Sequence, residues 1–199
     1  WLKDSSIGRK FVMSISGLAL VFFLIFHGCM NLALVFSEEA YNTICRLLGA
    51  NWYALIATLG LAFLVLVHFS YGIYLTIQNR AARGNDKYAV RGKKEGVDWA
   101  SENMLVLGFV VIGFIVLHLY NFWYKMQFAE IIGVKTGMFD PHNGAAFVKA
   151  LFTTPVSGQI YCGLYLIWLT ALWFHLNHGV WSAMHTMGLN NLKWEKRTK

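Results

Sequence analysis

The sequence predicts an all-α fold, a polytopic bundle of transmembrane helices. Of its 199 residues, 57% are hydrophobic and only 14% are charged, which is too apolar for an ordinary soluble domain. Four stretches lack Asp, Glu, Lys and Arg, and each exceeds the roughly 20 residues that a spanning helix needs. These stretches are Phe11–Ser37, Leu47–Asn79, Asn103–Tyr124 and Ala150–Leu192. We therefore expect one domain over residues 1–199 that crosses the membrane four times.

The distribution of positive charge predicts how the bundle is oriented. Thirteen of the 17 Lys and Arg residues lie on the two termini and on the loop between the second and third stretches. The four on the other side are Arg46, Lys125, Lys135 and Lys149. Because cytoplasmic loops carry the excess of Lys and Arg, we expect the N-terminus and the middle loop to be cytoplasmic. The same distribution favours a membrane over nucleic acid as the reason for the net charge of +7.

The first half of the chain predicts two helices. Residues 1–10 form a short inner segment at the lipid interface, and the first helix follows over about 11–36. This stretch is longer than the apolar core of a signal peptide, and no Ala-x-Ala-like site follows it, so we interpret it as a spanning helix. A short outer loop over 37–51 ends at the aromatic pair Trp52-Tyr53, which anchors a second helix over about 52–78.

The second half predicts two more helices. An inner loop over 80–98 is rich in Gly and charge, and the third helix covers about 101–128. An outer segment over 129–154 contains a short interfacial helix near 145–152, with His142 as an ordinary loop residue. Pro155 and Ser157 suit the start of a fourth helix over about 156–187, and a basic tail follows. Cys29, Cys45 and Cys162 have no CxxC spacing, which predicts neither a disulfide framework nor a zinc site.

No Asp, Glu, Lys or Arg interrupts the four predicted helices at membrane depth, so histidine is the only ionisable residue there, and each helix carries at least one. A lone buried histidine can simply bond a neighbouring carbonyl, but intramembrane ionisable groups are functional candidates by default. With a rise of 1.5 Å per residue, His27 and His118 both lie roughly 25 Å above the inner edge. His68 and His175 both lie roughly 15 Å above it. The sequence therefore predicts two pairs of imidazoles at two levels.

Paired imidazoles at one depth predict haem ligation, with His27, His68, His118 and His175 as the candidate cofactor-binding and iron-ligating residues. Two imidazoles can hold one haem iron from both faces in an apolar slot between helices. Two pairs imply two stacked b haems and a role in electron transfer. Gly72 and Gly179 each stand four residues after a histidine, on the same face, where a missing side chain leaves room for a flat ring. Close helix packing is the other explanation for these glycines.

Two further histidines on the fourth helix leave alternatives open. His178 is a rival to His175, but only His175 repeats the His-x-x-x-Gly spacing of the second helix. His185 lies near the inner edge. It could bind a haem propionate or a quinone, or its polar ring could simply snorkel to the interface.

The motifs that carry a family resemblance cover nearly the whole chain. They are Ser16–Leu18, Phe26-His27, His68–Gly72, Val116–His118, His175–Gly179, Ser182 and Gly188–Asn190. This pattern resembles the di-haem cytochrome b membrane anchor of succinate dehydrogenases and fumarate reductases, the single-subunit b558-type of many bacteria. The resemblance implies that His27 and His118 ligate the distal haem, and that His68 and His175 ligate the haem nearer the catalytic subunits. Since the family usually has a fifth spanning helix, a fifth is expected beside the four.

The resemblance also implies a function in the bacterial cytoplasmic membrane. A flavoprotein subunit with FAD would oxidise succinate on the cytoplasmic side, and an iron-sulfur subunit would dock on the basic inner face and relay electrons. This anchor would not act on succinate itself but would pass electrons through two haem b groups to a quinone, often menaquinone. The sequence offers candidates for the quinone site on both the outer and the inner side and does not choose between them. They are Asn31, Tyr120 and Asn121 on the outer side, and Arg9, Ser16 and Tyr74 on the inner side.

Two other functions are considered beside this one. The first is the cytochrome b subunit of another respiratory dehydrogenase, such as a hydrogenase or a formate dehydrogenase. The second is a transporter without haem whose histidines relay protons. A proton-coupled transporter would need carboxylates or broken helices at the midplane, and the sequence shows neither.

Overall fold

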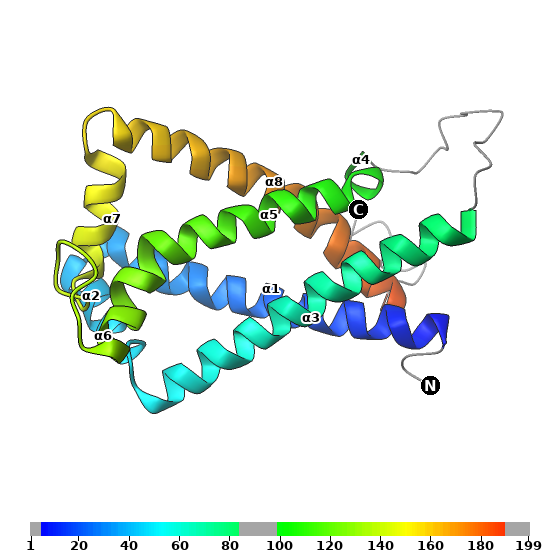
Figure 1. Ribbon diagram of the computed structural model, residues 1–199, viewed down its shortest axis with the longest axis horizontal. Coiled ribbons are helices and arrows are strands. Elements are labelled where there is room, and N and C mark those ends of the chain that lie inside the picture. The colour runs from blue at the N-terminus through cyan, green and yellow to red at the C-terminus, as the bar shows by residue number, and fades with distance from the viewer. Residues whose placement is uncertain (1–4, 84–98, 190–199) are drawn as a thin grey trace. The chain divides into compact units, whose positions relative to one another are not determined.

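The computed structural model describes residues 5–83 and 99–189, which are helical apart from short connections and contain no strand (Figure 1). Within these ranges, four helices are long and apolar enough to cross a membrane: Ser6–Phe36, Trp52–Ala82, Met104–Ile132 and Ser157–Thr186. Large apolar side chains such as Phe22, Leu59 and Leu166 remain more than half exposed on these helices, as surfaces that contact lipid require. The predicted all-α membrane fold is confirmed.

The first two spanning helices are longer than the sequence predicts. Helix α1 (Ser6–Phe36) begins at Ser6 rather than near residue 11, because the Ser5 hydroxyl accepts a hydrogen bond from the Gly8 backbone N–H at 2.9 Å and caps the first turn. Residues 6–10, which were predicted as a short inner segment before the helix, are therefore part of α1. Helix α3 (Trp52–Arg83) continues past the predicted end near residue 78. The rest of the predicted inner loop, residues 84–98, and the basic tail, residues 193–199, lie outside the described residues.

The predicted outer loop over 37–51 is instead mostly a helix, α2 (Glu38–Leu47). The Ser37 hydroxyl accepts a hydrogen bond from the Ala40 backbone N–H, and Glu38 and Glu39 place negative charge in the first turn. Arg46 lies in the last turn, so both ends have the charge that the helix dipole favours. The capping pattern was present in the sequence, but the segment was too short and polar to count as a spanning helix.

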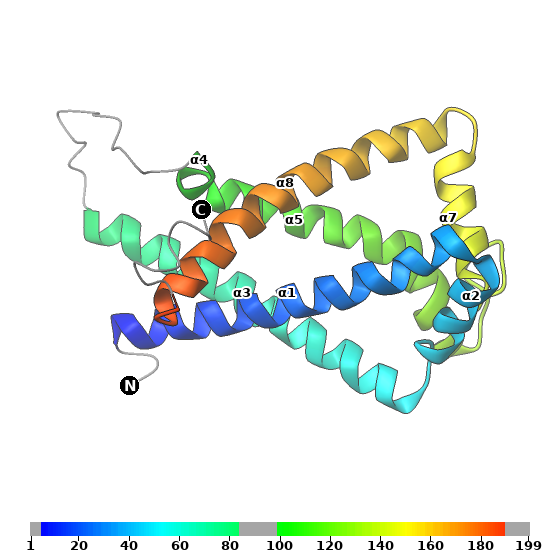
Figure 2. The same ribbon diagram turned by 180° about the vertical axis from the view of Figure 1, so that it is seen from behind.

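The expected short helix after the third span is present as α7 (Gly144–Thr153) and lies beside α2 in both views (Figures 1 and 2). Two asparagines join the pair. The Asn42 amide donates to Asn143 Oδ1 at 3.1 Å, and Asn42 Oδ1 accepts from the Ala145 backbone N–H at 2.9 Å. Lys149 and Glu38 add an ion pair.

The third span is interrupted in a way that the sequence did not predict. After α4 (Trp99–Glu102) and α5 (Met104–His118), the backbone follows a π-helix, η1 (Leu119–Phe128), before α6 (Ala129–Ile132). π-Helical turns are rare, and they often occur at functional sites. In this chain the π-helix begins directly after His118. Helix α8 (Ser157–Thr186) forms the fourth span, and Pro155 lies in the turn before it.

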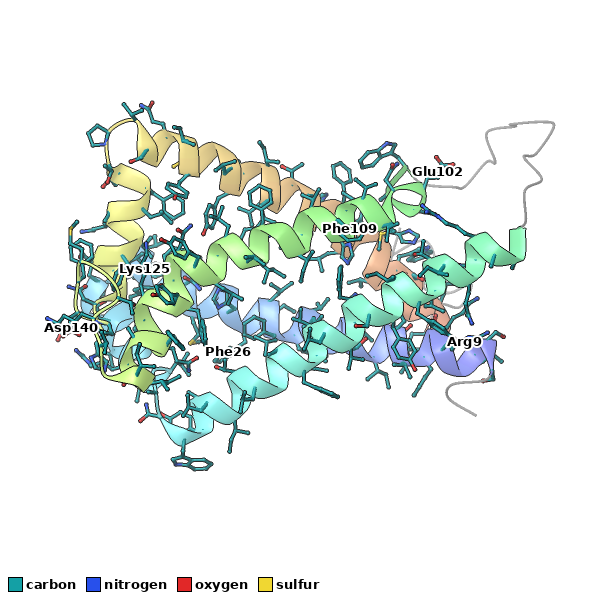
Figure 3. All side chains as sticks on the ribbon, in the orientation of Figure 1. Arg9, Phe26, Glu102, Phe109, Lys125 and Asp140 are labelled. Carbon is teal, nitrogen blue, oxygen red and sulfur yellow. The ribbon has the colours of Figure 1, made fainter. Side chains whose placement is uncertain are left out.

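His142 lies in the loop between α6 and α7, as expected, but it has two acidic neighbours. Its Nδ1 lies 3.1 Å from Asp140 Oδ1, and its Nε2 lies 3.2 Å from Glu130 Oε1. A hydrogen bond from the His142 backbone N–H is the main cause that lowers the pKa of Asp140 below its usual value. Glu130 also accepts a hydrogen bond from the Ala50 backbone N–H at 2.9 Å. Figure 3 labels Asp140 in this loop.

The chain forms two compact units, and each spanning helix contributes to both. Unit 1 consists of the described residues within Trp1–Val21, Phe63–Phe109 and Ala171–Lys199. Unit 2 consists of Phe22–Ala62 and Val110–Thr170, and it includes α2, η1, α6 and α7. Arg9, Glu102 and Phe109, which Figure 3 labels, belong to unit 1.

Gly144, the first residue of α7, lies close to side chains of α2. A Cβ atom at this position would collide with the Cys45 sulfur and would come within 3.0 Å of the Tyr41 ring. Tyr41 is 8% exposed, and its burial, followed by the effect of Cys45, raises its pKa to about 12. Tyr41 is therefore enclosed and has little room to move, and Cys45 is half-buried.

We expect Gly144→Ala to lower the free energy of unfolding by about 1–3 kcal/mol, the usual cost of overpacking. Gly163 is the matched control, because a Cβ atom there meets nothing within 4 Å, so Gly163→Ala should be neutral or slightly stabilising. Thermal unfolding of the two variants in detergent measures the difference. Equal melting temperatures would contradict the close approach of α2 and α7.

Candidate functional site

The structure brings the four candidate histidines together as two pairs. In unit 1, the rings of His68 on α3 and His175 on α8 have centroids 6.2 Å apart and an interplanar angle of 70°. In unit 2, the rings of His27 on α1 and His118 at the end of α5 have centroids 5.8 Å apart and an interplanar angle of 84°. These are the two pairings that the depth argument predicts.

The centroid separations agree with two imidazoles on opposite sides of one metal ion. An imidazole nitrogen binds a first-row metal at about 2.0 Å and the ring centre lies about 1 Å beyond it, so the two centroids are about 6 Å apart. The observed 5.8 and 6.2 Å both fit this value. Among the described residues there is no group of three or more His, Cys, Asp and Glu side chains that could hold a bare metal ion. The donor set at each pair is therefore two imidazoles, as a bis-histidine haem requires.

One imidazole of each pair, His118 and His175, is poorly explained as a structural histidine. A structural histidine in a helix bundle hydrogen-bonds to a neighbouring group, because an unpaired buried polar atom costs free energy. Nδ1 of His118 and Nδ1 of His175 are both buried and have no partner within the part of the chain that the structure describes. Nδ1 of His68 lies 3.2 Å from the Ser16 hydroxyl, which is a side chain and not a carbonyl. A ligand that the imidazoles hold would account for their burial.

Small residues line the pair in unit 1. A Cβ atom on Gly17 would lie 3.1 Å from His68 Cε1, and a Cβ atom on Gly108 would lie 3.9 Å from His175 Cε1. Gly179 has nothing within 4 Å of such an atom, and Gly72 has only the end of the Met13 side chain at 3.6 Å. The space beside Gly179 is thus open, whereas the end of the Met13 side chain lies in the space beside Gly72. Gly17 and Gly108 were not recognised from the sequence, since neither has helical spacing to the histidine it contacts.

Aromatic side chains surround the pair in unit 2. Phe23 stacks on His27 with centroids 5.3 Å apart, and Phe122 lies 5.2 Å from His118. The ring of Trp168 on α8 lies 5.5 Å from His118. Such a shell excludes water and provides flat apolar surfaces. The Trp168 indole N–H is buried without a hydrogen-bond partner in the described residues, so it is able to donate to a bound group.

The rival histidines of α8 lie elsewhere. The ring that lies against His68 is that of His175, not of His178. The ring of His185 packs edge-on against Trp181, with centroids 4.6 Å apart, near the end of the helix. The spacing argument that favoured His175 over His178 thus agrees with the contacts.

The quinone-site candidates of the outer side differ in whether their polar atoms have partners. The Asn31 amide donates to the His27 carbonyl at 2.8 Å, and its oxygen accepts from the Tyr41 hydroxyl at 3.2 Å. Asn121 is 3% exposed and donates to the Tyr165 hydroxyl, but its Oδ1 has no partner among the described residues. Tyr120 is exposed and stacks on a neighbouring tyrosine. Asn121 is therefore the buried outer candidate whose side chain has hydrogen-bonding capacity left for a ligand.

The inner-side candidates are less available. Ser16 uses its hydroxyl within the protein, with the Met13 carbonyl at 3.1 Å and His68 at 3.2 Å. The Tyr74 hydroxyl accepts a hydrogen bond from the Gln78 side chain at 2.7 Å. Arg9 is half-buried in the first turn of α1.

Comparison with known proteins gives one family. A family profile described as "Succinate dehydrogenase/Fumarate reductase transmembrane subunit" matches residues 11–117 of this chain. The match covers more than half of the 199 residues and includes two of the four paired histidines, His27 and His68. A search of curated proteins and a search of solved structures each gave no significant match.

Proposed function

Because this chain belongs to the family of succinate dehydrogenase and fumarate reductase transmembrane subunits, we propose that it is a di-haem cytochrome b anchor that passes electrons between an iron-sulfur subunit and membrane quinone. The main support for the proposal is that four imidazoles form two pairs. The two members of each pair lie on different spanning helices, and their centroid separation suits one iron.

Each pair would supply both axial ligands of one b haem. A haem held by two imidazoles would supply one-electron transfer and would leave no open site for oxygen. His68 and His175 would hold the haem nearer the catalytic subunits, and His27 and His118 would hold the other. The protein's own contribution is to fix the imidazoles on rigid helices and to exclude water with Phe23, Trp168 and their neighbours.

The family is the membrane subunit of a larger complex, and partner subunits with catalytic function follow from membership. We place an iron-sulfur subunit and an FAD flavoprotein on the cytoplasmic side of a bacterial cytoplasmic membrane. Support comes from the charges at one end of α1 and α3, where Arg9, Lys10, Arg80 and Arg83 lie in the helices themselves. The proposed electron acceptor is a quinone, with menaquinone as the first one to test.

The test is a count of haem per chain in the complex purified from membranes with its partner subunits. A pyridine haemochrome assay should give two b haems per anchor chain, and the co-purified subunits should include a flavoprotein. A complex with its flavoprotein but without haem would overturn the di-haem proposal. A partner that contains nickel or molybdenum in place of the flavoprotein would transfer the chain to another respiratory dehydrogenase.

A further inference from the structure

Ser16 and His68 are in contact within unit 1, although they are 52 residues apart in the sequence. Ser16 Oγ lies 3.2 Å from His68 Nδ1 and 3.1 Å from the backbone carbonyl oxygen of Met13. The serine is 3% exposed, so water does not compete for its hydroxyl group. The contact therefore joins α1 to α3 through a buried polar group beside a candidate ligand.

The number of protons available at this contact selects one tautomer of His68. A serine hydroxyl has a single hydrogen, and the Met13 carbonyl can only accept, so the hydroxyl donates to Met13. The lone pairs of Oγ are then free to accept from Nδ1–H of His68. This arrangement satisfies both contacts at once. It leaves Nε2 unprotonated, which is the state that a metal-ligating nitrogen needs.

Packing holds the same ring from another side. A Cβ atom on Gly17 would lie only 3.1 Å from His68 Cε1, which means that the imidazole edge rests on the α1 backbone at this glycine. Ser16 and Gly17 together therefore fix both the tautomer and the position of the ring. His175, the other member of the pair, has no comparable support, since its Nδ1 is buried without a partner in the described part of the chain.

We propose that Ser16 is a positioning residue for the haem held by His68 and His175, and that its hydrogen bond lowers the reduction potential of that haem. The proposal rests on the di-haem function proposed above. A ligating histidine that donates its other N–H to an acceptor is held in orientation and becomes a stronger electron donor through its ligating nitrogen. Stronger donation stabilises ferric over ferrous iron, and hydrogen bonding near the axial ligand is one of the means by which a protein sets haem potential.

The test compares Ser16→Ala with the unchanged chain in the intact complex. Ser16→Ala should keep two haems per chain, but a redox titration of the visible α-band should show a higher midpoint potential for one haem and an unchanged potential for the other. The electron paramagnetic resonance spectrum of the ferric low-spin haems, which depends on ligand orientation and basicity, should change for the same haem. Ser16→Thr, which keeps a hydroxyl, should restore both readouts.

Thr76→Val is the matched control. It removes a hydroxyl from the helix that carries His68, but this hydroxyl bonds the carbonyl of Gly72 within its own helix at 2.8 Å. Both midpoint potentials should stay as in the unchanged chain.

The outcomes separate this proposal from the one on which it rests. Two haems with unchanged potentials in Ser16→Ala would overturn the role of Ser16 and would leave the di-haem anchor intact. A Ser16→Thr complex that behaves like Ser16→Ala would also overturn it, because keeping a hydroxyl at this position would then not preserve the potential. An unchanged chain without haem would instead refute the di-haem function.

Discussion

His118→Ala is expected to leave a complex with one haem per chain in place of two, and the haem that remains should be the one held by His68 and His175. Alanine would remove one of the two imidazoles of the unit 2 pair, whose ring centroids lie 5.8 Å apart. The pair in unit 1 lies on different residues and keeps both ligands. A pyridine haemochrome assay and the α-band of the reduced complex measure the loss.

The reciprocal variant and a matched control make this result specific. His68→Ala should remove the other haem, so the two single variants should retain haems with different α-band maxima or different midpoint potentials. His178→Ala alters another histidine of α8, one helical turn from His175. The ring beside His68 is that of His175 and not that of His178. It should keep both haems. Loss of one haem from His178→Ala with retention in His175→Ala would transfer the ligand assignment to His178.

The pairing of the histidines could be predicted from sequence because it depends on helix geometry alone. Uncharged stretches fix where each helix enters the membrane, and the rise per residue then converts position into depth. Errors of several residues at the helix ends do not disturb this argument. Although α1 begins at Ser6 rather than near residue 11, the structure still brings His27 to His118 and His68 to His175.

Side-chain neighbours across helices could not be predicted in the same way. Depth says nothing about rotation about the helix axis, so it did not show that Ser16 faces His68 or that Gly108 contacts His175. Tautomers and close approaches depend on which faces meet. The sequence of a single helix gives only the rule that a glycine four residues from a histidine lies on the same face of that helix.

The π-helix η1 also had no usable sequence signal. Residues 119–128 contain no Pro or Gly that would mark an irregular turn, and their apolar and aromatic content suits an α-helix equally well. The altered register is stabilised by long-range partners. Gln127, near its end, bonds two backbone carbonyls in the connection between α2 and α3, and a local pattern does not contain that information.

Gln127→Leu is expected to lower the free energy of unfolding by about 3 kcal/mol, because it would leave several buried polar groups unpaired. Gln127 is 8% exposed, and its amide makes four hydrogen bonds. Its oxygen accepts from the Thr58 hydroxyl at 2.9 Å and from the Trp123 indole N–H at 2.8 Å. Its nitrogen donates to the Gly49 carbonyl at 2.9 Å and to the Leu48 carbonyl at 3.3 Å. Leucine fills a similar volume but satisfies none of these partners.

Gln78→Leu is the control that separates this network from the general effect of replacing a glutamine. The Gln78 side chain is only partly buried and bonds one neighbour on its own helix, the Tyr74 hydroxyl, so its replacement should change stability by no more than about 0.5 kcal/mol. Thermal unfolding in detergent should place Gln127→Leu about 6–12 °C below the unchanged chain and Gln78→Leu close to it. If both variants melted together, the amide of Gln127 would not hold η1 to the α2–α3 connection, and the π-helical register would need another source of stability.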